Sequence, residues 1–107
     1  VPQRPPTAYG DGMVAMVVVE LEFTDSSETA PRMALRPRHR EIISQLHAGG
    51  EVTLAGPFDD GSGSMVVFTT DRARVDEVLA SDPYYSAAGV TVVSVRELTP
   101  LVPADHP

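Results

Sequence analysis

The sequence contains no cysteine among its 107 residues. Disulfides, a catalytic thiolate, iron–sulfur clusters and cysteine-ligated zinc are therefore excluded. Basic residues are also few, because eight Lys+Arg stand against 15 Asp+Glu and leave a formal charge of −7. A phosphate backbone or an anionic lipid surface would be repelled on average. We therefore expect neither nucleic acid nor a membrane as a partner.

Long hydrophobic runs are missing as well. The longest, Met13–Val19, ends at Glu20 and is far shorter than the ~20 residues needed to span a bilayer. No charged-then-apolar leader precedes it, so we expect no signal peptide and a soluble, cytoplasmic protein. The hydrophobic fraction of 42% is typical of a single globular domain.

Proline and glycine gather at the two ends of the chain. Residues 1–12 are rich in both and show no periodicity, which predicts an extended N-terminal arm. Residues 100–107 repeat this composition and predict a C-terminal tail. Residues 13–99 are then the folded domain.

Hydrophobic periodicity predicts four strands and two helices within this domain. A first helix carries Ile42, Ile43 and Leu46 at helical spacing, with Pro37 in its first turn and Gly49-Gly50 at its end. Thr70 or Asp71 caps a second helix, and Asp82-Pro83 begins a short helical turn. The predicted strands are Met13–Phe23, Glu51–Ala55, Ser64–Thr70 and Val90–Leu98.

The resulting order β-α-β-β-α-β is the ferredoxin-like α+β arrangement, an antiparallel sheet with both helices on one face. The opposite face of a sheet rich in valine needs cover. In so short a chain a second copy would provide it, so we expect a homodimer.

The sequence lacks the common motifs for nucleotide binding (GxGxxG and GxxxxGK[ST]), for metal binding (HExxH) and for a nucleophilic serine (GxSxG). The loop FDDGSG at 58–63 lies in a hairpin and lacks the spacing of a calcium loop. His39 and His47 lie eight residues apart, about 80° around a helix, and so do not converge. We expect no metal and no cofactor.

The residues able to carry chemistry each have a plain structural explanation too. His39 precedes Ile42 and Ile43 by three and four residues, which fits a satisfied core histidine. Asp82 before Pro83 fits a helix cap. Packing aromatics and a solvated basic face explain the rest, although phenols and guanidinium groups also bind ligands: these are Tyr84, Tyr85, Arg32, Arg36, Arg38 and Arg40.

Three segments in series resemble the YCII-related (YciI-like) family of the dimeric α/β-barrel superfamily. They are LRPRHREIISQLHAGG at 35–50, LAGPFDDGSGSMVVF at 54–68 and ASDPYYSAAGV at 80–90. The resemblance implies a subunit that dimerises sheet to sheet. It also implies a catalytic pair at the positions of His39 and Asp82.

A His–Asp pair suits proton transfer, because the carboxylate sets the imidazole tautomer and raises its basicity. The resulting hypothesis is a cofactor-independent lyase, isomerase or cyclase acting on a small aromatic or polyketide-derived molecule of secondary metabolism. His39 would be the base, Asp82 would orient it, and Arg36, Tyr84 or Tyr85 would hold the substrate. A non-catalytic small-molecule-binding or accessory module is the alternative, and a cofactor-free oxygenase is a third hypothesis.

Overall fold

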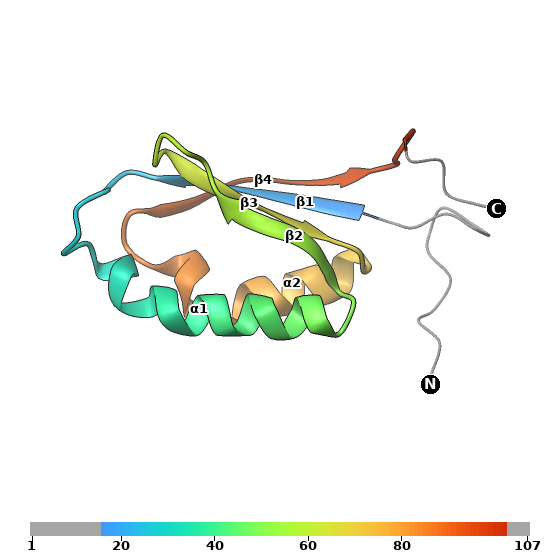
Figure 1. Ribbon diagram of the computed structural model, residues 1–107, viewed down its shortest axis with the longest axis horizontal. Helices are drawn as coiled ribbons and strands as arrows, with labels where there is room; N and C mark the ends of the chain where they lie inside the picture. Colours follow the sequence, from blue (N-terminus) through green and yellow to red (C-terminus); the bar gives the residue numbers. More distant parts are fainter. Residues whose placement is uncertain (1–15, 103–107) are drawn as a thin grey trace.

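A computed structural model describes residues 16–102 of the chain (Figure 1). The predicted N-terminal arm, the start of the first strand and the end of the C-terminal tail lie outside these residues. The elements are β1 (Met16–Phe23), α1 (Pro31–Ala48), β2 (Val52–Pro57), β3 (Gly63–Phe68), α2 (Arg72–Ser81), the 3-10 turn η1 (Pro83–Ser86) and β4 (Val90–Leu98).

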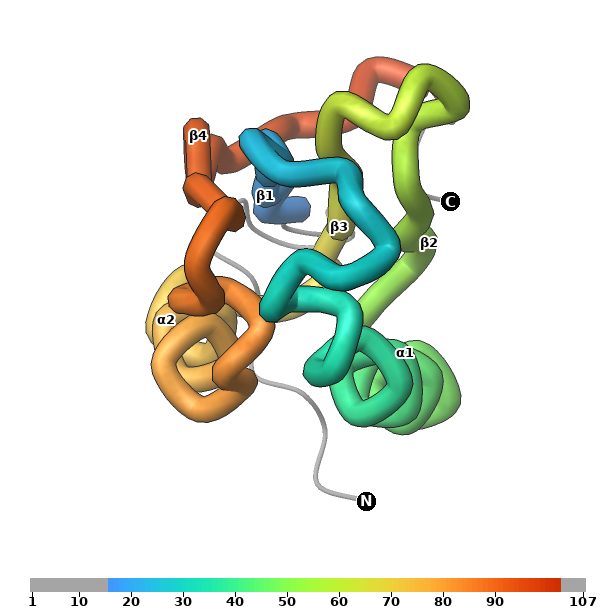
Figure 2. The backbone as a smooth tube through the Cα atoms, turned by 90° about the vertical axis from the view of Figure 1, so that its left-hand side faces the viewer, coloured from blue at the N-terminus to red at the C-terminus, as the bar shows by residue number. Residues whose placement is uncertain are grey.

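The four strands form one antiparallel sheet in the order β2-β3-β1-β4. Both helices lie on the same side of this sheet, with α1 under the β2 edge (Figures 1 and 2). The predicted ferredoxin-like α+β arrangement is confirmed. None of the helices within residues 16–102 is long and apolar enough to cross a membrane.

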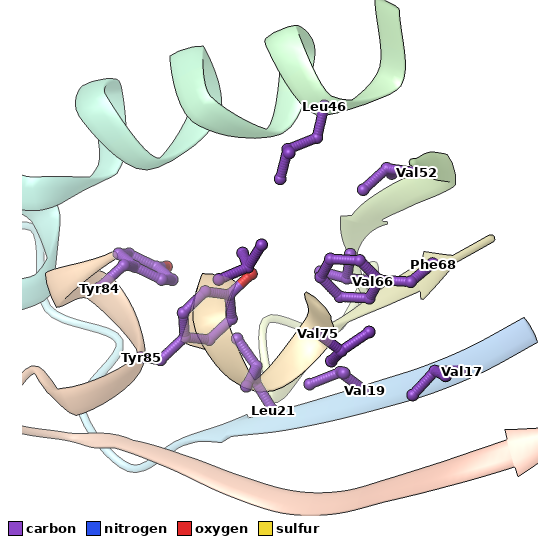
Figure 3. Packing of buried hydrophobic residues seen from close by; sticks show 11 residues of the cluster. Val17, Val19, Leu21, Leu46, Val52, Val66, Phe68, Val75, Tyr84 and Tyr85 are labelled. Atoms are coloured by element: carbon purple, nitrogen blue, oxygen red, sulfur yellow. The ribbon is translucent and has the colours of Figure 1, made fainter. Parts of the chain in front are cut away.

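The core lies between the sheet and the helices. Val17, Val19 and Leu21 of β1 are almost fully buried, as the two-residue period of a strand requires for one buried face. Val66 and Phe68 of β3 pack beside them, and side chains of the two helices, such as Leu46 and Val75, complete the cluster (Figure 3). This apolar layer joins the sheet to both helices and to the η1 turn.

The first helix begins six residues earlier than predicted. Pro31 rather than Pro37 occupies its first turn, and Pro37 lies inside the helix on its exposed side. The prediction of the start was wrong because both prolines fit a first turn, and only packing selects between them. The predicted end is confirmed: Gly50 takes φ +84°, and the Glu51 N–H donates to the Leu46 carbonyl at 2.8 Å.

A glycine allows β3 to begin close against β1. A Cβ built on Gly63 would stand 1.9 Å from the Leu21 carbonyl oxygen, a distance that no side chain can occupy. Glycine is therefore the residue that lets the β2–β3 hairpin pair with β1 at this point.

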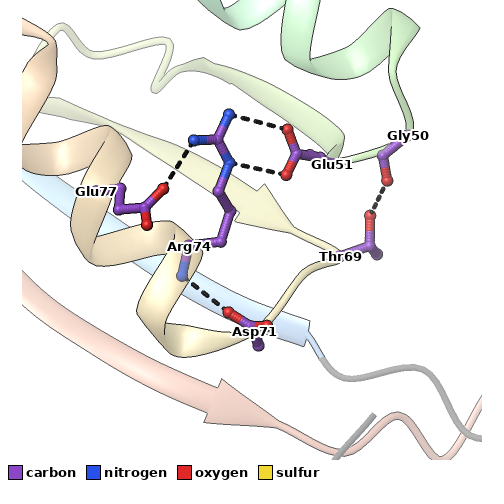
Figure 4. A network of polar contacts seen from close by, with 6 residues as sticks. All are labelled: Gly50, Glu51, Thr69, Asp71, Arg74 and Glu77. Carbon is purple, nitrogen blue, oxygen red and sulfur yellow. Dashed lines mark hydrogen bonds and ion pairs between the residues drawn. The ribbon is translucent and has the colours of Figure 1, made fainter. Parts of the chain in front are cut away.

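The second helix is tied to the start of β2 by a forked ion pair. Arg74 donates from Nε and from its second terminal nitrogen to the two carboxylate oxygens of Glu51, at 2.9 and 3.2 Å (Figure 4). Asp71 caps the helix by accepting from the Arg74 N–H at 2.8 Å. These contacts hold the start of α2 against the α1–β2 junction.

The other face of the sheet carries apolar side chains, and no helix within residues 16–102 lies on it. Val18 lies between the inward-facing Val17 and Val19, and its cross-strand partner Val67 is paired in turn with Leu54. Leu54 is 55% exposed, whereas Val67 is only 8% exposed. The apolar surface that this row leaves exposed therefore lies mainly at Leu54, on the edge strand β2.

Candidate active site

His39 lies in the middle of α1 on the side that faces the core. It precedes Ile43 by four residues, so both side chains share one face of the helix. The residue is 8% exposed. Helical spacing therefore buries the imidazole beside the apolar stripe, as the sequence predicted.

Asp82 meets His39 across 43 residues of sequence, with His39 Nδ1 and Asp82 Oδ2 2.7 Å apart. Asp82 is 1% exposed, and its other carboxylate oxygen accepts from the Tyr84 N–H at 3.0 Å. The aspartate thus caps the η1 turn with one oxygen and holds the histidine with the other. The predicted cap is therefore present, and the same carboxylate also contacts His39.

The carboxylate decides which ring nitrogen carries the proton. A carboxylate accepts hydrogen bonds, so Nδ1 is the donor of this pair. In the neutral imidazole the remaining nitrogen, Nε2, then carries a free lone pair. No residue within 16–102 hydrogen-bonds to Nε2, and His39 lines a cleft. The pair therefore leaves one ring nitrogen without a partner among these residues, in a histidine that lines a cleft.

Two tyrosines pack around the imidazole. Tyr84 stacks on His39 with ring centroids 4.1 Å apart and planes at 12°. Tyr85 meets the same ring edge-on at 5.3 Å and 86°. Both belong to the buried core (Figure 3). Neither tyrosine lines the cleft. Both rings instead pack against the imidazole of His39.

The buried Arg32 holds the Tyr84 ring of this stack in place. Arg32 donates to the Tyr84 hydroxyl at 3.2 Å and to the Asp25 carbonyl at 3.2 Å. Its guanidinium group lies 4.0 Å from the centre of the Phe23 ring, a favourable cation–π contact. The sequence grouped Arg32 with a solvated or ligand-binding basic face, whereas the structure places it inside, where it fixes the Tyr84 ring.

The cleft lies between α1 and the inner side of the sheet edge formed by β2 and β3. Its volume is about 320 Å³, at the lower end of the sizes typical of small-molecule sites. The α1 wall consists of His39, Arg40, Ile43 and Ser44, and the sheet wall of Ala55, Gly56, Pro57, Ser64, Met65 and Val66. Arg36, predicted as a substrate ligand, is half-buried one turn before Arg40 and is not part of the lining.

Tyr85 is the residue of the site whose pKa is clearly shifted. Burial, with a smaller effect of the Asp82 carboxylate, raises the pKa of the Tyr85 phenol above its usual range. Tyr85 therefore remains neutral beside His39 at ordinary pH. Across residues 16–102, no three His, Asp or Glu side chains converge as metal ligands.

A comparison with protein families places the chain among known sequences. The family model of the YCII-related domain matches residues 15–99. The chain belongs to the YCII-related family. No curated protein matches it. The match spans every described element of this YCII-related domain, including the helix that carries His39 and the turn that carries Asp82.

Ser64 is the cleft residue that the sequence prediction missed. It begins an otherwise apolar inner row that continues with Val66 and Phe68. A hydroxyl on the buried face of a strand is an available signal, because a buried polar group needs a partner. In the sequence this signal is weak, because Ser64 directly follows the polar loop at 58–63 and can equally be its last residue.

Proposed function

We propose that this YCII-related protein is a general acid/base enzyme of the lyase, isomerase or cyclase type that needs no cofactor. One observation carries the proposal: the buried His39–Asp82 pair has Nδ1 and Oδ2 at 2.7 Å, and His39 lines a cleft. Groups with this geometry move protons near neutral pH. The substrate is a small molecule, and aromatic or polyketide-derived compounds of secondary metabolism are the class to test first.

The chemical step follows from the free nitrogen. His39 Nε2 takes a proton from a C–H or O–H group of the bound substrate, and the electron pair stays on the substrate. Asp82 stabilises the imidazolium formed at that moment. The proton then returns at another atom, which is isomerisation, or the electron pair expels a leaving group, which is elimination.

Proton exchange with solvent tests this proposal before the true substrate is known. The protein is incubated in D₂O with small ketones, phenols and keto acids, and NMR follows the replacement of substrate hydrogen by deuterium. We expect exchange to fall by about 10²-fold or more in His39→Asn. Asparagine keeps a donor near Nδ1 for Asp82 but has no counterpart of Nε2.

Asp82→Asn is the matched second variant. The asparagine can still accept from the Tyr84 N–H but no longer requires a proton on Nδ1, so the other tautomer becomes favoured. ¹⁵N NMR of the histidine should show the change of tautomer together with the loss of exchange. Full exchange activity in His39→Asn would overturn the proposal.

A binding or accessory module is the second candidate function. It is favoured by the enclosure of His39, whose ring is stacked on Tyr84 and bonded to Asp82 as a satisfied core histidine would be. This candidate predicts saturable ligand binding that survives His39→Asn, with no deuterium exchange in the wild-type protein. Within the described residues, no observation favours the third hypothesis, a cofactor-free oxygenase.

The working form in this proposal is a cytoplasmic homodimer joined through the sheet face that carries Leu54. Two such faces would bury Leu54, which is 55% exposed in the single chain. Sedimentation analysis of the wild-type protein should give twice the mass of one chain. The Leu54→Asp variant should sediment with the mass of a single chain. A wild-type protein that sediments as a monomer contradicts the dimer.

A further inference from the structure

The cleft beside His39 carries positive charge that no acidic side chain neutralises. Arg40 lines it, and none of the other lining residues is acidic. Within residues 16–102, Arg40 and Arg36 make no hydrogen bond or ion pair through their guanidinium groups. The other described arginines each have a partner: Arg32, Arg38, Arg72, Arg74 and Arg96.

The two unpaired arginines stand next to each other. They are four residues apart on α1, so one lies a turn above the other on the face that also presents Ile43 and Ser44. In a chain of net charge −7, an anion is repelled by most of the surface. The unpaired guanidinium group of Arg40 at the cleft, with that of Arg36 one turn away, marks the place where an anion is accepted.

Ser64 adds a second polar group deeper in the same cleft. The residue is 8% exposed, and its hydroxyl has no partner within residues 16–102. α1 and β2 run in opposite directions from their short junction, so the end of β2 lies opposite an earlier part of α1 (Figure 1). Ser64 is paired with Pro57 at the end of β2 and lines the same cleft as His39.

The remaining walls are apolar. Ile43 lines the cleft from the helix, and Ala55, Pro57 and Val66 line it from the sheet. A ligand that fits has an apolar body, one negative charge for the arginines and one oxygen for the serine. A carboxylate matches a guanidinium group by its planar, two-oxygen geometry.

We propose that this cleft binds small hydroxy- or oxo-carboxylates with an apolar or aromatic body. The carboxylate lies against Arg40, with Arg36 adding charge from the preceding turn, and Ser64 Oγ donates to the second oxygen near His39. The proposal assigns a substrate class and two specificity-determining residues, Arg40 and Ser64. It rests on the proposed function, because these residues line the same cleft as His39.

Ligand binding tests the assignment without any turnover. The probes are meta- and para-hydroxybenzoate, their neutral amides, and benzoate, which lacks the hydroxyl; NMR titration of the labelled protein gives each Kd. In the wild-type protein a hydroxybenzoate should bind at millimolar concentration or better, more tightly than its amide, and added salt should weaken it.

The variants separate the two contacts. Arg40→Gln should weaken the hydroxybenzoate about tenfold and leave the amide unchanged. Arg38→Gln is the matched control. Arg38 lies two residues before Arg40 and carries the same charge, but its guanidinium group is paired with Glu41. Ser64→Ala should weaken the hydroxybenzoate about fivefold and leave benzoate unchanged. Thermal unfolding of each variant checks that the fold is intact.

Each outcome decides between the two proposals. Equal binding of acid and amide, equal losses in Arg40→Gln and Arg38→Gln, or failure of both hydroxybenzoates to bind overturns the substrate class. If binding follows Arg40 and Ser64 and survives His39→Asn while no deuterium exchange is found, the substrate class stands and the acid/base function fails. If exchange occurs only with neutral compounds, the function stands and the substrate class fails.

Discussion

Removing one hydroxyl from each of the adjacent tyrosines should change the stability in opposite directions. Tyr84 and Tyr85 are 3% and 5% exposed, so both phenols are out of contact with bulk water. The Tyr84 hydroxyl accepts a hydrogen bond from Arg32 at 3.2 Å. The Tyr85 hydroxyl is buried and has no hydrogen-bond partner among residues 16–102. Tyr84→Phe and Tyr85→Phe are therefore the same chemical change in two different environments.

The magnitudes follow from this difference. Burying a hydroxyl without a partner costs about 1–3 kcal/mol, so Tyr85→Phe should raise the free energy of unfolding by about 1 kcal/mol. Tyr84→Phe leaves a donor of the buried Arg32 without its acceptor and should lower that free energy by about 2 kcal/mol. For a domain of this size, each kcal/mol shifts the melting temperature by about 4–8 °C.

Alkaline pH should widen the gap for Tyr85. Burial raises the pKa of this phenol in the folded protein, whereas in the unfolded chain it ionises near its ordinary value of about 10. Between the two values the folded state binds more protons, so stability is complete below pH ~10 and falls above it. The slope of this contribution is about 1.4 kcal/mol per pH unit, and Tyr85→Phe should remove it.

Urea unfolding of the three proteins at neutral pH, and of the wild type and Tyr85→Phe above pH ~10, measures all of this. The wild type should lose stability relative to Tyr85→Phe as the pH rises. A Tyr85→Phe protein that is less stable than the wild type at both pH values would refute the reasoning. It would mean that the Tyr85 hydroxyl has a partner in solution.

Two further changes test the contacts that hold the site in place. Gly63→Ala should destabilise the fold by several kcal/mol or prevent it, because its Cβ would overlap the Leu21 carbonyl; a melting temperature equal to the wild type contradicts the close approach. The Arg74–Glu51 pair is partly exposed, so a double-mutant cycle with Arg74→Gln and Glu51→Gln should give a coupling of only about 0.5–1 kcal/mol. A coupling indistinguishable from zero in low salt would show that the fork is not maintained in solution.

Much of the fold could be predicted because its signals are local. Val19, Leu21 and Phe23 alternate in the sequence with the polar residues at 20, 22 and 24, and this two-residue period predicts a strand. Gly49-Gly50 ends α1 by backbone conformation, and Asp71 caps α2 through a neighbouring N–H. The start of α1 could not be predicted, because Pro31 and Pro37 carry the same local signal.

The candidate site divides in the same way. Helical spacing alone predicted that His39 lies on the buried side of α1, and the pair Asp82-Pro83 predicted the cap of the following turn. The contact between them joins residues 43 positions apart, and no local pattern specifies such a contact. It was expected only through the family resemblance.

The sequence by itself determined the strands, the end of α1, the cap of α2, the acidic character and the family of this chain, because those properties depend on composition and near neighbours. Only the tertiary structure decided what surrounds His39. Packing α1 against the sheet edge makes a cleft that contains Ser64 and an unpaired Arg40, and packing η1 beneath the sheet turns Tyr84 and Tyr85 inward onto the imidazole. These environments arise from contacts between distant segments, and burial and charge pairing exist only once those segments meet.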